Sequence, residues 1–242
     1  MTNTEIKFIK SLSQKKFRDQ SGLFVVEGEK LVAEALSSRF QVEKVYRKDE
    51  IGEAAMARIS ALSTPSPALA LVRRPDDLSS APMPQKGLFL ALDGIRDPGN
   101  LGTILRIADW FGIVAVYASP DTVDVFNPKV AQATMGAIFR VRFHYTDIPA
   151  LCSRVLQEGG KVYGTFLDGD NLYRTALDDG ADAPAVIVIG NEANGISPET
   201  GACVSHRLFI PPFPADDPGS ESLNAAVATA VTVAEFRRRG NY

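Results

Sequence analysis

From residue 88 onward, short apolar runs alternate with segments of helical periodicity. The runs are continuously apolar, which is typical of strands buried on both faces of a sheet. The predicted strands are residues 88–92, 113–117, 162–167, 185–189 and 207–210. The predicted helices are residues 101–111, 128–135, 148–157 and 221–239. This alternation predicts an α/β fold with a mostly parallel sheet and helices on both faces, in which ligands bind at the carboxyl ends of strands.

The first 75 residues show a smaller mixed pattern. Strand-like runs occupy residues 23–27, 42–46 and 68–72, and helical patterns occupy residues 29–36 and 53–62. Residues 73–86 are rich in Pro, Ser and Asp and have no periodicity, which is typical of a linker. We therefore predict a small α/β domain over residues 1–75, a linker over 76–86 and a larger domain over 87–242.

Composition excludes several classes of protein. The chain has 242 residues, of which 45% are hydrophobic and 23% charged, as in ordinary globular proteins. The longest apolar run, residues 225–234, is too short to span a membrane, and the first ten residues lack the apolar core of a signal peptide. Cys152 and Cys203 have no CxxC spacing, so we expect reduced core residues of a cytoplasmic protein. With only His144 and His206 in addition, a metal site is not expected.

A basic cluster lies close to the N-terminus, although the net charge of the chain is -3. Its members are Lys7, Lys10, Lys15, Lys16 and Arg18. Such a cluster is typical either of a surface that binds RNA phosphates or of a solvated helix face, and charge alone does not separate these alternatives.

Three loops that follow predicted strands carry residues suited to binding. In the first, residues 93–100, Asn100 is a candidate N-cap for the next helix, and Arg106 lies about one turn beyond Gly102. A capped helix with a surface arginine is the structural alternative. The second, residues 190–197, resembles a phosphate-binding P-loop in spacing, but Ile196 stands at the lysine position, which disfavours nucleoside triphosphates.

The third loop, residues 210–224, precedes the last helix. Ser220 is a candidate cap for that helix, and Asn224 is a poor helix former whose amide is available for binding. The alanines that follow leave room for a close packing partner.

Together the three loops resemble the signature motifs of the SpoU branch of the SPOUT RNA methyltransferases. The first resembles D-x-x-x-D-P-x-N-x-G-x-x-x-R and is matched by Asp93, Asp97, Pro98, Asn100, Gly102 and Arg106. The second resembles G-x-E-x-x-G-[IL]-S and is matched by Gly190, Glu192, Gly195, Ile196 and Ser197. The third resembles I-P…S-L-N and is matched by Ile210, Pro211, Ser222, Leu223 and Asn224. Residues 4–75 are also similar to the ribosomal-protein-like RNA substrate-binding domain of many members.

The resemblance implies S-adenosylmethionine as methyl donor, a ribose 2′-hydroxyl of rRNA or tRNA as acceptor, a trefoil knot and a homodimer. It implies cofactor binding by Gly190, Ile210 and Leu223. It implies a catalytic and positioning set of Asn100, Arg106, Glu192, Ser222 and Asn224. It also favours RNA contact for the basic cluster, Lys7, Lys10, Lys15, Lys16 and Arg18. Two departures from the family pattern are the long, Pro- and Asp-rich segment 212–219 and the Ala193-Asn194 pair in the second loop.

The sequence leaves the role of Arg106 open. The family arginine is proposed as a general base, but a guanidinium normally keeps its proton, so Arg106 could instead bind a phosphate or stabilise an alkoxide. Two other functions are also open: an RNA-binding module without catalysis, and an α/β enzyme with a different nucleotide-like cofactor.

Overall fold

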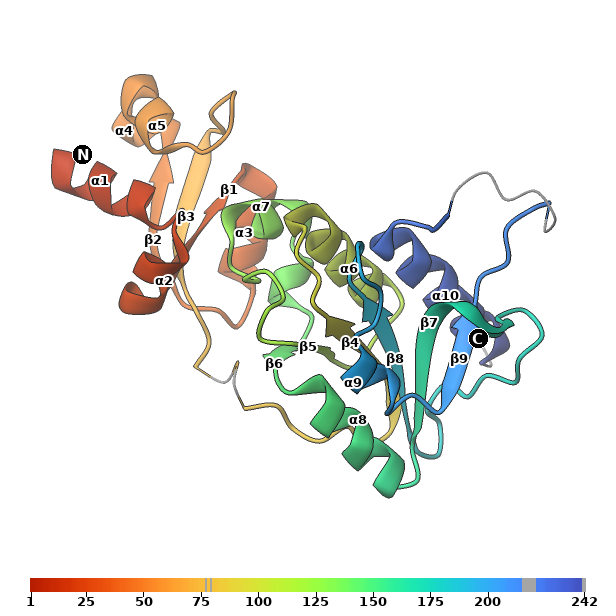
Figure 1. The fold of residues 1–242 in the computed structure, drawn as a ribbon. Coiled ribbons are helices and arrows are strands. Elements are labelled where there is room, and N and C mark those ends of the chain that lie inside the picture. The colour runs from red at the N-terminus through yellow and green to blue at the C-terminus, as the bar shows by residue number, and fades with distance from the viewer. Residues whose placement is uncertain (77, 79, 215–220, 241–242) are drawn as a thin grey trace. The chain divides into compact units, whose positions relative to one another are not determined.

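The computed structural model describes residues 1–76, 78, 80–214 and 221–240 (Figure 1). The chain forms two compact units. The N-terminal unit contains Met1–Asp76 together with Asp124–Arg140, and the C-terminal unit contains Asp77–Val123 and Val141–Tyr242. In the described parts of the chain, no helix is long and apolar enough to cross a membrane.

The N-terminal unit is built on a three-stranded antiparallel sheet in the order β1-β3-β2. Its strands are β1 (Leu23–Glu27), β2 (Val42–Arg47) and β3 (Ala68–Arg73). Its first five helices are α1 (Asn3–Ser11), α2 (Lys15–Ser21), α3 (Glu29–Ser37), α4 (Lys48–Ile51) and α5 (Glu53–Ile59). All three predicted strands are confirmed. The helix predicted over 53–62 ends at Ile59, because Ser60 is extended and its hydroxyl donates to the buried carboxylate of Glu27.

Residues 124–140 complete the N-terminal unit, although the sequence places them within the predicted 87–242 domain. They form α7 (Pro128–Ala133) and the 3-10 helix η1 (Ala137–Phe139). Phe126 lies 4.5 Å from Phe24, and Phe139 lies 5.2 Å from Phe40 between ring centroids. This aromatic cluster explains why the segment packs with the N-terminal unit, since burying large rings is strongly favourable.

The C-terminal unit contains a six-stranded parallel sheet in the order β6-β5-β4-β8-β7-β9. Its strands are β4 (Gly87–Asp93), β5 (Val116–Ala118), β6 (Phe143–Tyr145), β7 (Lys161–Asn171), β8 (Pro184–Gly190) and β9 (His206–Phe209). Its helices are α6 (Pro98–Trp110), α8 (Ile148–Gln157), α9 (Pro198–Gly201) and α10 (Ala225–Arg239). The predicted α/β fold is confirmed; the trefoil knot stays a prediction.

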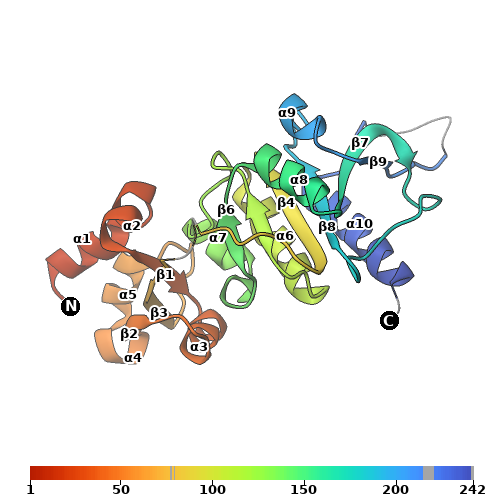
Figure 2. The same cartoon turned by 90° about the horizontal axis from the view of Figure 1, so that it is seen from below.

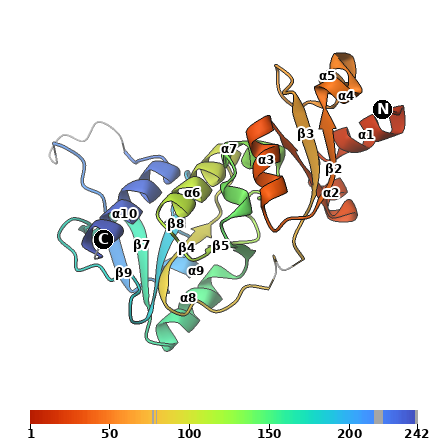
Figure 3. The ribbon, with the colours of Figure 1, turned by 180° about the vertical axis from the view of Figure 1, so that it is seen from behind.

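The sheet is covered on both faces, as Figures 2 and 3 show. Helices α6 and α10 lie together on one face, while α8 and α9 lie on the other. Under α8, apolar side chains from β4 and β8 interdigitate with those of the helix. This packed core includes Phe89, Ala91, Ile148, Leu151, Cys152, Val155, Val186 and Val188. Cys152 is buried, as predicted for a core residue, and burial raises the pKa of its thiol to about 12.

The predicted linker packs against the C-terminal unit. The Tyr117 hydroxyl donates to the Pro82 carbonyl at 2.7 Å, and the Tyr145 N–H donates to the Leu78 carbonyl at 2.9 Å. Both bonds end on main-chain carbonyls of the segment, and the second comes from the edge strand β6.

Candidate active site

The candidate site begins where the two central strands end. Strands β4 and β8 are parallel neighbours, and Asp93 pairs in register with Gly190. The loops that follow these strands therefore start side by side, as expected at the carboxyl edge of a parallel sheet.

The second loop is closed on itself directly after β8. Asn191 and Gly195 exchange both backbone hydrogen bonds at 2.9 Å, and Gly195 has a φ of +69°. A Cβ at position 190 would lie 2.2 Å from the carbonyl carbon of Gly195. Gly190 is therefore required by the tight fold of the loop itself, in addition to any contact with a ligand.

The prediction that Asn100 caps helix α6 is wrong. The N-cap is Asp97, whose carboxylate accepts from the Asn100 N–H at 2.8 Å, and Pro98 occupies the first helical position. Asn100 consequently lies in the first turn, and its side-chain amide is available for other partners.

A chain of hydrogen bonds joins side chains from all three loops. The Asn100 Nδ2 donates to Glu192 Oε1 at 2.6 Å, and Asn224 Nδ2 donates to Asn100 Oδ1 at 2.8 Å. Asn224 Oδ1 in turn accepts from the N–H groups of Ala226 and Val227. Glu192 and Asn224 lie 92 and 124 positions from Asn100 in sequence, so only the fold brings the three residues together.

Asn224 is the N-cap of α10, so this helix begins at Ala225 and not at residue 221 as predicted. Its Oδ1 satisfies two otherwise free N–H groups of the first turn while its Nδ2 reaches Asn100. The other predicted cap, Ser220, lies outside the described residues.

Two predicted catalytic residues are not part of this chain of bonds. Arg106 is exposed on α6, and Ser222 is exposed before α10. Within the part of the chain that the structure describes, neither side chain has a hydrogen bond or ion pair with another residue.

The predicted cofactor residues lie at the last residue of β8, directly after β9 and shortly before α10. Gly190 and Ile210 are half-buried, whereas Leu223 is 48% exposed although it is apolar. Leu223 directly precedes Asn224, so an apolar surface adjoins the hydrogen-bonded chain. The unusual segment 212–219 lies mostly outside the described residues.

The basic cluster divides into two kinds of residue. Lys7, Lys10 and Lys16 are exposed, and Lys15 pairs with Asp19 at 2.7 Å. Arg18 is only 1% exposed, donates twice to Asp124 and donates to the carbonyls of two further residues. We therefore leave Arg18 out of the candidate RNA surface, because its guanidinium is occupied inside the N-terminal unit.

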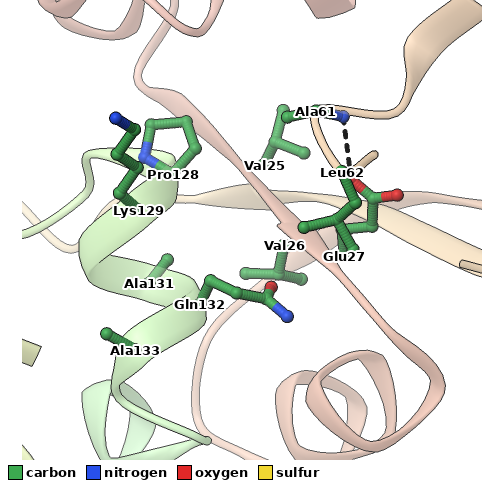
Figure 4. Close-up of a pocket in the computed structure, with 10 residues that line it drawn as sticks. All are labelled: Val25, Val26, Glu27, Ala61, Leu62, Pro128, Lys129, Ala131, Gln132 and Ala133. Carbon is green, nitrogen blue, oxygen red and sulfur yellow. Dashed lines mark hydrogen bonds between the residues drawn. The ribbon is translucent and has the colours of Figure 1, made fainter. Parts of the chain in front are cut away.

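A cavity of about 310 Å³ lies within the N-terminal unit, between β1, the segment after α5 and α7 (Figure 4). Its lining residues include Val25, Val26, Leu62 and Ala131, with Gln132 turned toward it. None of them is a predicted site residue. Among the described residues, no three His, Cys, Asp or Glu side chains are grouped so as to hold a metal ion.

Two residues that join the loops were not singled out as site residues from the sequence. The Asp93 carboxylate accepts from the N–H and hydroxyl of Ser197 at 2.8 and 2.7 Å. The Asn191 amide donates to the Gly94 carbonyl at 2.6 Å. Their positions at the last residue of β4 and directly after β8 were the available signal, since strand ends in this fold carry functional side chains.

Family models match both parts of the chain. The model of the SpoU rRNA methylase family matches residues 87–234, and that of the MRM3-like substrate binding domain matches residues 3–64. The chain is 31% identical to the 23S rRNA (guanosine(2553)-2′-O)-methyltransferase RlmP of Bacillus subtilis, over 97% of this chain and 96% of that protein.

Solved structures are similar over almost the whole chain. An AdoMet-bound rRNA methyltransferase from Sinorhizobium meliloti has a TM-score of 0.87 and 28% identity, covering 100% of this chain and 97% of that one. A protein from Porphyromonas gingivalis, assigned to the TrmH family of RNA methyltransferases, has a TM-score of 0.88 and 39% identity, covering 99% of both chains. Because a family model covers more than half of the sequence and a relative above 30% identity spans it, the chain belongs to the SpoU rRNA methylase family.

Proposed function

We propose that this chain transfers a methyl group from S-adenosylmethionine to a ribose 2′-hydroxyl of ribosomal RNA. The observation that carries the proposal is the chain of hydrogen bonds Glu192–Asn100–Asn224, which joins one residue from each of the three loops. Methyl transfer needs an in-line approach of acceptor oxygen and donor methyl, and a rigid set of polar side chains supplies such alignment.

The residues present fit S-adenosylmethionine. The half-exposed Leu223 and the half-buried Ile210 offer apolar surface for a purine or the carbons next to sulfur. Gly190 at the end of β8 has no side chain because the backbone of Gly195 fills that space, so the contact proposed for Gly190 is made by its main chain. When bound, this cofactor supplies an already activated methyl group on a sulfonium.

The polar residues position the acceptor. Glu192 holds the Asn100 amide through Nδ2, and Asn224 holds the same amide through Oδ1, so the orientation of Asn100 is defined at both ends. Ser222, exposed two residues before Asn224, supplies a hydroxyl next to this set. These residues orient the ribose hydroxyl and exclude misaligned binding.

Arg106 supplies positive charge. A guanidinium carries its proton at physiological pH, and the exposed Arg106 has no acidic partner among the described residues. We therefore assign Arg106 to binding an RNA phosphate or the emerging alkoxide, and not to accepting the hydroxyl proton.

The N-terminal unit binds the RNA through Lys7, Lys10, Lys15 and Lys16. These lysines are exposed on α1 and α2, within the region that matches the MRM3-like substrate binding domain. Phosphate contacts of this kind give affinity and position without base specificity.

A homodimer completes the proposal. Trp110 on α6 is 84% exposed, and Val227 on the adjoining α10 is 47% exposed. Leu223, shortly before α10, is 48% exposed. Exposed apolar side chains on two packed helices are typical of a protein interface, and Arg106 lies on the same helix as Trp110. Sedimentation equilibrium should give twice the mass of one chain, and Trp110→Glu should shift the equilibrium to monomer.

Calorimetry with S-adenosylmethionine and with S-adenosylhomocysteine tests the proposed function. We expect saturable binding of both, and methyl transfer to ribosomal RNA that is lost in Asn100→Ala. Absence of binding to either compound would overturn the proposal. RNA binding without methyl transfer would support a binding module instead.

A further inference from the structure

The loop that carries Glu192 is held in place largely by its neighbour, Asn191. The Asn191 Oδ1 accepts from the N–H of Ala193 at 2.8 Å and from that of Asn194 at 3.3 Å. These two bonds and the backbone pair with Gly195 define the turn in which Glu192 stands. The Glu192 side chain itself is exposed.

Asn191 also connects this turn to the first loop. Its Nδ2 donates at 2.6 Å to the carbonyl of Gly94, which directly follows β4. Two further bonds connect the same loops, from the N–H and the hydroxyl of Ser197 to the last residue of β4, Asp93. The turn is therefore fixed to the first loop on both sides of Glu192, and the first loop leads into the helix that carries Asn100.

We infer that Asn191 is a positioning residue that sets the distance between the Glu192 carboxylate and the Asn100 amide. Its Oδ1 accepts two hydrogen bonds within the second loop, and its Nδ2 donates one to the first loop, so only one N–H of the side chain has no partner among the described residues. Because the Asn100 Oδ1 accepts from Asn224, a change in the position of Asn100 also changes its bond with Asn224. The kinetic consequence rests on the proposed function, whereas the geometric consequence does not.

Asn191→Asp is the most informative substitution. It keeps the Oδ1 acceptor of the turn but replaces the donor by an oxygen that faces the Gly94 carbonyl. The Asn191–Gly94 connection is therefore lost, while the turn and the Ser197–Asp93 bonds are kept. Asn194→Asp is the matched control. It adds the same charge to the same turn, and within the described residues the Asn194 side chain makes no hydrogen bond.

The first readout is the NMR signal of the Asn100 side-chain amide in the full chain, assigned by its disappearance in Asn100→Ala. Asn191→Asp should shift this signal toward its position in Glu192→Ala, and Asn194→Asp should leave it unchanged. An unchanged Asn100 signal in Asn191→Asp would overturn the inference. This readout holds whether or not the chain methylates RNA.

The second readout is the single-turnover rate of methyl transfer in a double-mutant cycle. Asn191→Asp should lower the rate about tenfold alone but less than twofold in the Glu192→Ala background, because it acts through Glu192. Equal effects in both backgrounds, or no effect alone, would overturn the inference. If Asn191→Asp does not fold, Asn191→Ser serves, since its hydroxyl can accept within the turn but is too short to reach Gly94. A wild-type chain without transfer would overturn the proposed function and leave the NMR result standing.

Discussion

At the scale of single residues, Asn100 bonds to one hydrogen-bond acceptor and to one hydrogen-bond donor. It donates to the carboxylate of Glu192 and accepts from the amide of Asn224. Asn100→Asp would place two carboxylates at hydrogen-bonding distance, so we expect a loss of roughly 100-fold in the rate of methyl transfer. Adding Glu192→Gln restores a donor opposite the new carboxylate and should recover much of the rate. Failure of the double variant to exceed Asn100→Asp would show that this hydrogen bond is not what the reaction needs.

Arg18 stabilises the N-terminal unit through a buried ion pair. Its Nη2 lies 2.6 Å from the carboxylate of Asp124, and both side chains are almost fully buried. Arg18→Met leaves Asp124 without a counter-charge, and the free energy of unfolding should fall by about 3 kcal/mol in urea denaturation. Arg18→Met with Asp124→Asn removes the uncompensated charge and should recover part of this loss. A single variant as stable as the wild type would mean that this ion pair does not stabilise the N-terminal unit.

At the scale of secondary-structure elements, the end of α10 is held by Glu235. Hydrogen bonds from Arg238 and then Arg239 lower the pKa of Glu235 to about 2, against the opposing effect of burial. Arg239 also donates to the carbonyl of Thr175 at 2.6 Å, which fastens the helix to the loop after β7. Because the pKa is depressed on folding, the stabilisation is full above the usual value of 4.5 and is lost as the pH falls toward 2.

Glu235→Gln should therefore lower the free energy of unfolding by roughly 2 kcal/mol at pH 7. The difference between wild type and variant should shrink as the pH falls from 4.5 to about 2. Chemical denaturation over that range measures it. A difference independent of pH would show that the lost contact acts through packing and not through charge.

Elements differ in how far the sequence predicts them. Strands β4 and β8 are predicted almost to the residue, because both faces are buried and the positions between their first and last residues are all apolar. Strand β6 is missed, since it has only three residues and includes a histidine. Helix α1 is missed although Thr2 and Glu5 form a capping box, a signal present in the sequence.

In the site and the basic cluster, features set by neighbouring residues were predictable from the sequence, whereas contacts between distant residues were not. That Asp97 and not Asn100 caps α6 follows from the local Asp-Pro pair and was available from the sequence. The partner of Arg18 lies 106 residues away, so no local pattern distinguishes this buried arginine from its exposed neighbours. The motifs identify Asn100, Glu192 and Asn224 as a set, but the order of donors and acceptors among them requires coordinates.

At the scale of the whole molecule, the exposed lysines predict how binding depends on salt. If Lys7, Lys10 and Lys16 contact phosphates, replacing all three by Ala should reduce the slope of log affinity against log salt by about 2, at roughly 0.7 for each single-stranded contact. Filter binding to ribosomal RNA at several salt concentrations measures the slope. Replacing the same three lysines by Arg keeps the charge and should leave the slope unchanged. An unchanged slope in the Ala variant would place the RNA elsewhere.

The chemical position of the transferred methyl group tests the account most directly. Ribosomal RNA would be incubated with the chain and S-adenosylmethionine that is labelled in the methyl group, and then hydrolysed with alkali. A methylated ribose has no free 2′-hydroxyl to attack the neighbouring phosphate, so we predict that the label is recovered in alkali-resistant dinucleotides. Label in mononucleotides, which would mean a methylated base, or no incorporation at all, would contradict the account.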